Sequence, residues 1–219
     1  MFIGHFALGF AAKKLEPRVS LATYFLAAQL PDVIWPVLLL TGTERVAIQP
    51  GDTAFTPLRF ISYPISHSLL AVALWGVLLA AVHWLDNRNG RAARLIGLLV
   101  VSHWVLDFVS HRPDLRVVPW STRVFGLGLW NSVPATLTVE LSMFAAGVGL
   151  YLSATWSRDV AGRLGAAGLV GFLLLAYLGA AFGPPPPSVT AVAVAGILGA
   201  AVILAWAVWL DGHREPVSP

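Results

Sequence analysis

Two histidines and an aspartate stand four residues apart in one apolar segment, at His103, Asp107 and His111. In a helix, residues four apart lie on the same face, so this spacing predicts a ladder of two imidazoles and a carboxylate. Ionisable groups at membrane depth are costly and usually mark a functional site. Imidazole nitrogen and carboxylate oxygen are ligands that a zinc-like divalent ion accepts. We therefore interpret the ladder as the core of a metal site.

The composition indicates a membrane protein. Of the 219 residues, 57% are hydrophobic and 11% are charged, whereas soluble domains are about 25% charged. The chain has no cysteine, which excludes disulfides and thiolate catalysis and leaves nitrogen and oxygen as metal ligands. The basic residues are scattered through short connections and form no face or arm. We therefore expect the lipid bilayer as a partner and no nucleic acid.

The lengths of the apolar segments predict an all-α polytopic bundle of about six transmembrane helices plus a short N-terminal helix. A membrane span needs about 20 apolar residues, so residues 2–12 are too short to cross. The predicted spanning or near-spanning helices cover 20–41, 66–85, about 95–111, 133–155, 164–182 and 189–210, and Pro31 predicts a kink in the first of them. We expect a site-bearing core at 1–155, two scaffold helices at 156–210 and a disordered tail at 211–219.

The distribution of lysine and arginine predicts the orientation in the membrane. If the spans alternate, nine basic residues lie on the side of Lys13 and five on the other, which favours the first side as cytoplasmic. The polar loops at 42–65 and 112–132 then face outward. At 1.5 Å per helical residue, the polar groups within the spans lie within roughly 12 Å of the outer surface. We therefore expect a site that opens to the outer side.

The order of the polar motifs resembles that of one family. His5, Leu30-Pro31-Asp32, Ser66-His67-Ser68 and His103-x-x-x-Asp107 follow one another as in the membrane-bound metal-dependent hydrolases. These are bacterial inner-membrane proteins, distantly similar to zinc-dependent phospholipase C and to the fungal single-strand zinc nucleases. The resemblance spans residues 1 to about 145 and includes the segments 111–115 and 126–132 and the carboxylate of Glu140.

The resemblance implies a phospholipase C-like metal core with two divalent ions, zinc being the expected metal, in a bacterial inner-membrane protein. The implied ligands are Asp32, His67 and His103 as terminal ligands, Asp107 as a bridging ligand, His5 on the second ion, and His111 and Glu140 either on a further metal position or holding the other ligands. Thr136 stands where the soluble relatives have the histidine of a late His-x-x-x-Glu pair. We therefore expect no third ion. We also expect no counterpart beside Met1 to the N-terminal amine ligand of those relatives.

The function implied by the resemblance is hydrolysis of a phosphoester, either a lipid-derived phosphodiester or a phosphomonoester, by attack of metal-bound hydroxide. Asp107 would hold the ions, and Arg112 or Arg116 would neutralise charge on the non-bridging oxygens. A lipid substrate fits because it can reach a membrane-embedded site laterally.

The same residues fit other classes of protein and other roles. A column of histidines and carboxylates also suits a divalent-cation transporter, two facing histidines suit a haem site, and a closed site suits a non-catalytic metal-binding protein. Asp32 could cap a helix after Pro31, and His111 suits a helix C-terminus. Most loop arginines are simply solvated or contact lipid phosphates, and this alternative applies to Arg112 and Arg116 as well.

Overall fold

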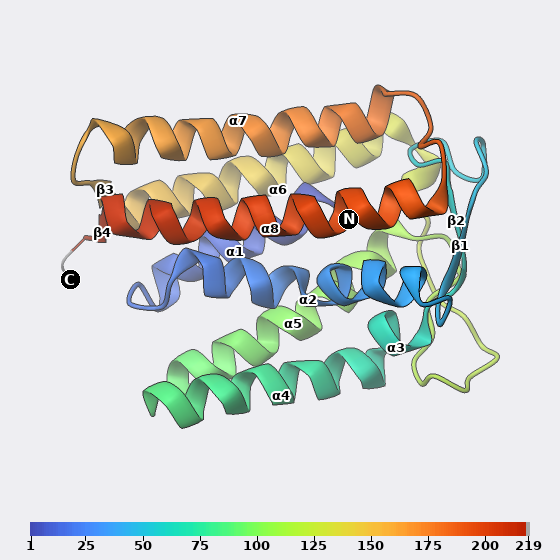
Figure 1. Cartoon of the computed structure of the whole chain (residues 1–219), viewed down its shortest axis with the longest axis horizontal. Coiled ribbons are helices and arrows are strands. Elements are labelled where there is room, and N and C mark those ends of the chain that lie inside the picture. The colour runs from blue at the N-terminus through green and yellow to red at the C-terminus, as the bar shows by residue number, and fades with distance from the viewer. Residues whose placement is uncertain (218–219) are drawn as a thin grey trace.

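The computed structural model describes residues 1–217, and these residues form a bundle of roughly parallel and antiparallel helices (Figure 1). Six of the described helices are long and apolar enough to cross a membrane. They are α2 (Leu21–Leu40), α4 (Leu69–Asn87), α5 (Gly90–Ser110), α6 (Val133–Ala154), α7 (Val160–Phe182) and α8 (Val189–His213). The shorter elements are α1 (Ile3–Leu15), α3 (Pro64–His67) and the 3-10 turn η1 (Leu129–Asn131). The predicted all-α membrane bundle with a short N-terminal helix is confirmed.

Helix α1 lies inside the bundle. In Figure 1, α6, α7 and α8 lie on one side of α1 and α2, and α4 and α5 lie on the other. The side chains of Ile3, Phe6 and Phe10 are buried in the main apolar core. A Cβ added to Gly147 of α6 would lie 2.3 Å from the carbonyl oxygen of Ala7. The backbones of α1 and α6 therefore touch, and this contact places the short helix deep among the spans.

The predicted polar loop at 42–65 contains a β-hairpin. Strand β1 (Arg45–Ile48) pairs antiparallel with β2 (Leu58–Ser62). The hairpin lies at the same end of the bundle as the 112–132 connection, as Figure 1 shows.

The helix predicted at 66–85 is divided into two helices. His67 lies in the separate helix α3, because Ser68 accepts a hydrogen bond from the backbone of Ala71 and caps a new helix, α4.

The prediction that the chain is disordered from Asp211 onward is wrong for the described residues 211–217. Helix α8 continues to His213, and β4 (Arg214–Pro216) then pairs with β3 (Thr155–Ser157). The Arg214 guanidinium donates hydrogen bonds to the carbonyl and hydroxyl oxygens of Thr155. The Asp211 carboxylate accepts from the Leu21 amide at 2.7 Å. These polar partners hold the segment, and they are too far away in sequence for local composition to reveal them. Residues 218–219 lie outside the described range.

Candidate metal centre

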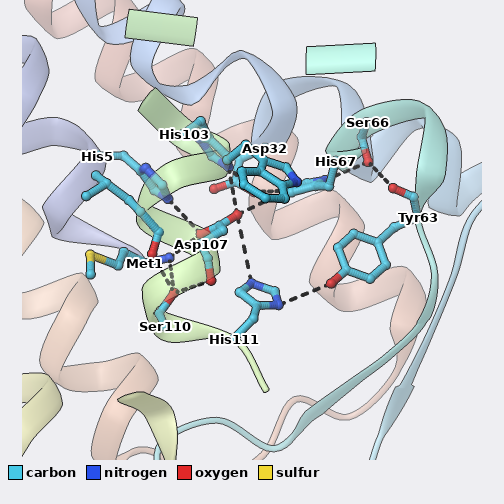
Figure 2. Close-up of polar contacts among 12 residues, drawn as sticks. Met1, His5, Asp32, Tyr63, Ser66, His67, His103, Asp107, Ser110 and His111 are labelled. Carbon is cyan, nitrogen blue, oxygen red and sulfur yellow. Dashed lines mark hydrogen bonds and ion pairs between the residues drawn. The ribbon is translucent and has the colours of Figure 1, made fainter. Parts of the chain in front are cut away.

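Four imidazole rings converge on the Asp107 carboxylate (Figure 2). Oδ2 of Asp107 lies 3.2 Å from Nε2 of His103, 3.7 Å from that of His67 and 3.8 Å from that of His111. Oδ1 lies 3.1 Å from Nε2 of His5. All five side chains are buried. They come from α1, α3 and α5 and from the residue that follows α5, so the fold brings together groups that are up to 106 residues apart in the sequence.

Asp32 completes the arrangement from α2. Its Oδ1 lies 3.3 Å from Nε2 of His67 and 3.7 Å from Nε2 of His103. Two triads of donor atoms are compact enough to hold an ion, and the members of each triad lie within 4.8 Å of one another: His5, His103 and Asp107 form one, and Asp32, His67 and His103 form the other. The two triads share His103. Five of the seven predicted ligands therefore lie in a potential metal position.

His103 is fixed by a backbone carbonyl. Its Nδ1 lies 2.8 Å from the carbonyl oxygen of Ala28, in the turn before Pro31. A carbonyl only accepts, so Nδ1 carries the hydrogen and Nε2 of the neutral ring presents a lone pair. That Nε2 is buried and has no hydrogen-bond partner within residues 1–217. It faces carboxylate oxygens of Asp32 and Asp107, and a positive charge, either a proton or a metal ion, stabilises such a cluster of electron pairs. A divalent ion with nitrogen and oxygen ligands fits this donor set.

His67 is fixed through a chain of two side chains. Its Nδ1 lies 2.7 Å from the hydroxyl oxygen of Ser66. The same hydroxyl donates to the Glu44 carboxylate, which also accepts from the amides of Ile65 and Ser66 at 2.7 and 2.9 Å. Glu44 is 1% exposed, so this charge is fully withdrawn from water. A carboxylate behind a histidine fixes the ring orientation and increases its basicity toward a metal.

His111 is fixed in a related way. Its Nδ1 lies 3.1 Å from Oδ1 of Asp114, which also accepts a hydrogen bond from the Tyr63 hydroxyl. Burial, together with the neighbouring Asp114 carboxylate, raises the pKa of the Tyr63 phenol well above its usual range. Tyr63 therefore remains a hydrogen-bond donor at neutral pH. His111 stands outside both compact triads but directs Nε2 toward the same Asp107 oxygen as His67 and His103.

The α-amino group of Met1 also lies at the centre. It contacts Oδ1 of Asp107 and donates to the Ser110 hydroxyl at 3.0 Å (Figure 2). From the sequence we expect no counterpart at Met1 to the N-terminal amine ligand of the soluble relatives. In the structure, the α-amino group of Met1 lies at the centre, so this expectation is wrong. Sequence reasoning also missed Ser110, Glu44 and the phenol of Tyr63. The spacing of Ser110, three residues after Asp107 in one helix, is a signal that could have identified it.

Glu140 was expected at a further metal position or beside the other ligands, but its partners are backbone amides of α1 and the residue before it. Its Oε2 accepts from the amides of Phe2 at 2.8 Å and Gly4 at 3.2 Å. These are free N–H groups at the start of α1, where a carboxylate is stabilised by the helix dipole. Glu140 belongs to neither compact triad. It therefore holds the helix that carries His5.

The two arginines differ in their surroundings. Arg112 forms ion pairs with Asp52 at 3.1 Å and Asp114 at 3.5 Å, so acidic groups already hold its charge. Arg116 donates to the carbonyl of Pro119 and lines a cavity of about 130 Å³. Residues from the centre line the same cavity: Tyr63, His67 and Asp114. Arg116 is therefore the better placed of the two to meet an anion beside the centre.

The fold and the site together define a multi-pass helical bundle with a buried histidine and aspartate centre near one end of its spans. Comparison of the chain with family models, with curated proteins and with solved structures gives no match.

Proposed function

We propose that the protein is an integral membrane metal-dependent hydrolase that cleaves a phosphoester. The observation that carries the proposal is the convergence of four imidazole Nε2 atoms on the Asp107 carboxylate, with Nδ1 of three of the rings held by oxygen atoms. Metal-binding histidines are held in this manner. The proposal includes two divalent ions, with zinc as the first candidate, and a bacterial inner membrane with the site toward the outer side.

In this proposal, the two triads hold two ions between them. Because His103 presents a lone pair only at Nε2, it would serve one ion. His5, His103 and Asp107 would hold the first ion, and Asp32 and His67, with Asp107 beside them, would hold the second. Asp107 lies next to both positions and is the candidate bridging ligand. Bound divalent ions would lower the pKa of a coordinated water toward neutrality and withdraw charge from a phosphoryl oxygen.

The protein groups around the centre supply binding and orientation. Arg116 faces the polar cavity next to His67 and is placed to neutralise a non-bridging phosphoryl oxygen. Glu44 and Asp114 hold His67 and His111 from behind, so the rings need no rearrangement when a substrate arrives. A rigid set of donors directed at developing charge is the usual source of electrostatic catalysis.

A cation pathway has less support from the core next to the centre. One to two helical turns before His103, the side chains of Val100 and Ile96 are fully buried against Val72 of α4 and Tyr24 of α2. An ion path through the membrane needs polar groups or water along its length. This apolar packing closes the side of the centre that points toward the opposite end of the bundle, so hydrolysis fits better than transport.

The test is to replace Asp107 with Asn and to measure bound metal and hydrolysis of bis-p-nitrophenyl phosphate on the same sample. We expect bound metal to fall and the rate to drop by about 100-fold or more, in the range seen when a catalytic electrostatic group is lost. Asp86→Asn, which removes an exposed carboxylate at the end of α4, is the control and should retain both. Full metal content together with full activity in Asp107→Asn would remove the mechanism.

A further inference from the structure

A second, larger cavity begins at the metal centre and runs between α2, α7 and α8. Its volume is about 520 Å³, within the roughly 300–1,000 Å³ of typical small-molecule sites. Apolar and small side chains line most of it, including Phe25, Phe172, Ala176, Gly199 and Leu204. Its lining on α8 extends from Val192 to Leu204, about 18 Å at 1.5 Å per residue. That length is about 60% of the roughly 30 Å hydrocarbon thickness of a bilayer.

One end of this cavity is polar, and two of its polar atoms lack partners. Asp32 lines the cavity and is the most exposed ligand of the centre, with 37% of its side chain accessible. Gln29 and Trp35, one turn of α2 to either side, also line it and are 7% and 8% exposed. Within residues 1–217, neither Oε1 of Gln29 nor Nε1 of Trp35 has a hydrogen-bond partner. Buried polar atoms without partners are costly, so these two point to a ligand with a polar group at this end.

The two cavities meet the centre from different sides. The smaller one is polar, with Arg116 and His67 in its wall, and the larger one is apolar with Asp32 at its end. His67 and Asp32 lie 3.3 Å apart. A molecule with a polar group at the centre would therefore find a polar space on one side and a hydrocarbon-like space on the other.

We propose that the larger cavity holds the alkyl chain of a lipid phosphoester and that its head group lies at the Asp32 end, where Nε1 of Trp35 can donate to a phosphate oxygen and Oε1 of Gln29 can accept from a hydroxyl of the head group. The identity of the polar group rests on the proposed hydrolase function. The alkyl chain is inferred from the apolar lining of the cavity, which lies between transmembrane helices. Water would form a new bond to phosphorus while one phosphorus–oxygen ester bond breaks, the leaving oxygen taking a proton or departing as an anion. Helices α7 and α8 are then part of the substrate site as well as scaffold.

Glycines of α7 and α8 offer matched substitutions. A Cβ added to Gly199 meets no atom within 4 Å, so Gly199→Phe fits the helix and fills the cavity. Gly171 of α7 also has open space around its Cβ but is not part of the cavity lining, so Gly171→Phe is the control. Ala176→Phe fills the cavity from the opposite wall and serves as a second test if Gly199→Phe does not fold.

The first measurement does not depend on activity. The full chain in phosphatidylcholine nanodiscs is irradiated with hexadecyl phosphate that carries a diazirine on its chain, and the labelled residues are mapped by mass spectrometry. We expect labels on the cavity faces of α7 and α8. Filling the cavity should reduce them by about tenfold, because burial of several methylene groups is lost, and Gly171→Phe should not. The proposed alkyl-chain site would be overturned if the lipid-facing side of α4 were labelled as strongly as the cavity faces of α7 and α8 and if Gly199→Phe left the labelling unchanged.

The second measurement separates this inference from the proposed function. Hydrolysis of hexadecyl p-nitrophenyl phosphate is compared with that of the methyl ester in the zinc-loaded protein. We expect the long-chain ester to have the higher kcat/KM and Gly199→Phe to remove that preference, whereas Gly171→Phe should keep both the preference and the methyl ester rate. Equal rates for both esters, with no labelled cavity, would overturn the chain site and leave the hydrolase standing. A labelled cavity without hydrolysis of either ester would support the chain site and overturn the hydrolase.

Discussion

At the scale of single residues, the centre depends on where three of its four histidines find an acceptor for Nδ1. His103 finds it in a backbone carbonyl, His67 in the Ser66 hydroxyl backed by Glu44, and His111 in a carboxylate. Because these contacts fix the ring orientations, Nε2 of all three points to Asp107. The residues behind the ligands are therefore as testable as the ligands themselves.

Removal of the Ser66 hydroxyl is the sharpest test of this support. Ser66→Ala disconnects His67 from Glu44 and leaves the carboxylate with one acceptor site unused. We expect the zinc affinity to fall by about tenfold, the lower end of what loss of a ligand's supporting hydrogen bond costs. Competition with a fluorescent zinc chelator measures it. Ser102→Ala, which removes a hydroxyl that donates to the carbonyl of Leu99, should keep the affinity. An unchanged affinity in Ser66→Ala would contradict the role of the relay.

Sequence spacing predicted part of this centre and could not predict the rest. The ladder of His103, Asp107 and His111 follows from helical periodicity alone. The positions of His5 and Asp32 beside it were inferred from a resemblance, and the structure brings both within reach of His103 or Asp107. Contacts such as Glu44 with Ser66, or Glu140 with the start of α1, join elements whose relative positions depend on tertiary packing. No local pattern encodes such contacts.

At the scale of elements, the position of α1 decides whether the centre is complete, because this helix carries His5 and packs against α5, which carries His103 and Asp107. Glu140 holds its first turn, and Gly147 lets its backbone meet that of α6. The sequence predicts a short helix here. Its burial inside the bundle depends on packing against other helices, which the sequence of the segment alone does not predict. The hairpin β1–β2 in the 42–65 loop was missed for a similar reason, since its strands are only four and five residues long.

Two glycines of α6 provide a matched test of the α1 contact. In Gly147→Ala, the new methyl group would lie 2.3 Å from the carbonyl oxygen of Ala7, so α1 must shift. We expect a loss of about 1–3 kcal/mol of stability, typical of overpacking, together with weaker zinc binding. In Gly149→Ala, the methyl group meets nothing within 4 Å, and alanine should stabilise the helix by about 0.5–1 kcal/mol. Thermal unfolding and zinc titration of both variants check this pair. Equal behaviour would contradict the proposed role of α1 in positioning His5.

At the scale of the whole molecule, the hairpin and the 112–132 connection lie at one end of the bundle, and the β3–β4 pair lies at the other (Figure 1). The centre is nearer the first end, because His111 follows the last residue of α5 and α3 precedes the first of α4. The hydrophobic segments predicted the spans well, with α5 beginning at Gly90 instead of near 95 because Asn89 caps it. The cavity beside α7 and α8 had no counterpart in the sequence, where both helices looked like uniform scaffold.

The proposed orientation can be tested cleanly because the chain has no cysteine. Thr122→Cys lies at the end of the bundle that carries the centre, and Lys14→Cys lies at the opposite end; both side chains are exposed. From the excess of basic residues at the Lys14 end, we expect a membrane-impermeant maleimide to label Thr122→Cys in intact cells. Lys14→Cys should react only after permeabilisation. The reverse pattern would place the centre on the cytoplasmic side.

The central claim, that buried imidazoles and carboxylates bind a pair of divalent ions, is tested most directly by X-ray absorption at the zinc edge on protein loaded with zinc and then desalted. We predict retained zinc in a shell of nitrogen and oxygen only, with Zn–N distances of about 2.0–2.1 Å and a second zinc about 3.5–4 Å away. A protein that retains no zinc after desalting, or that holds it without histidine nitrogen in the shell, would contradict the claim.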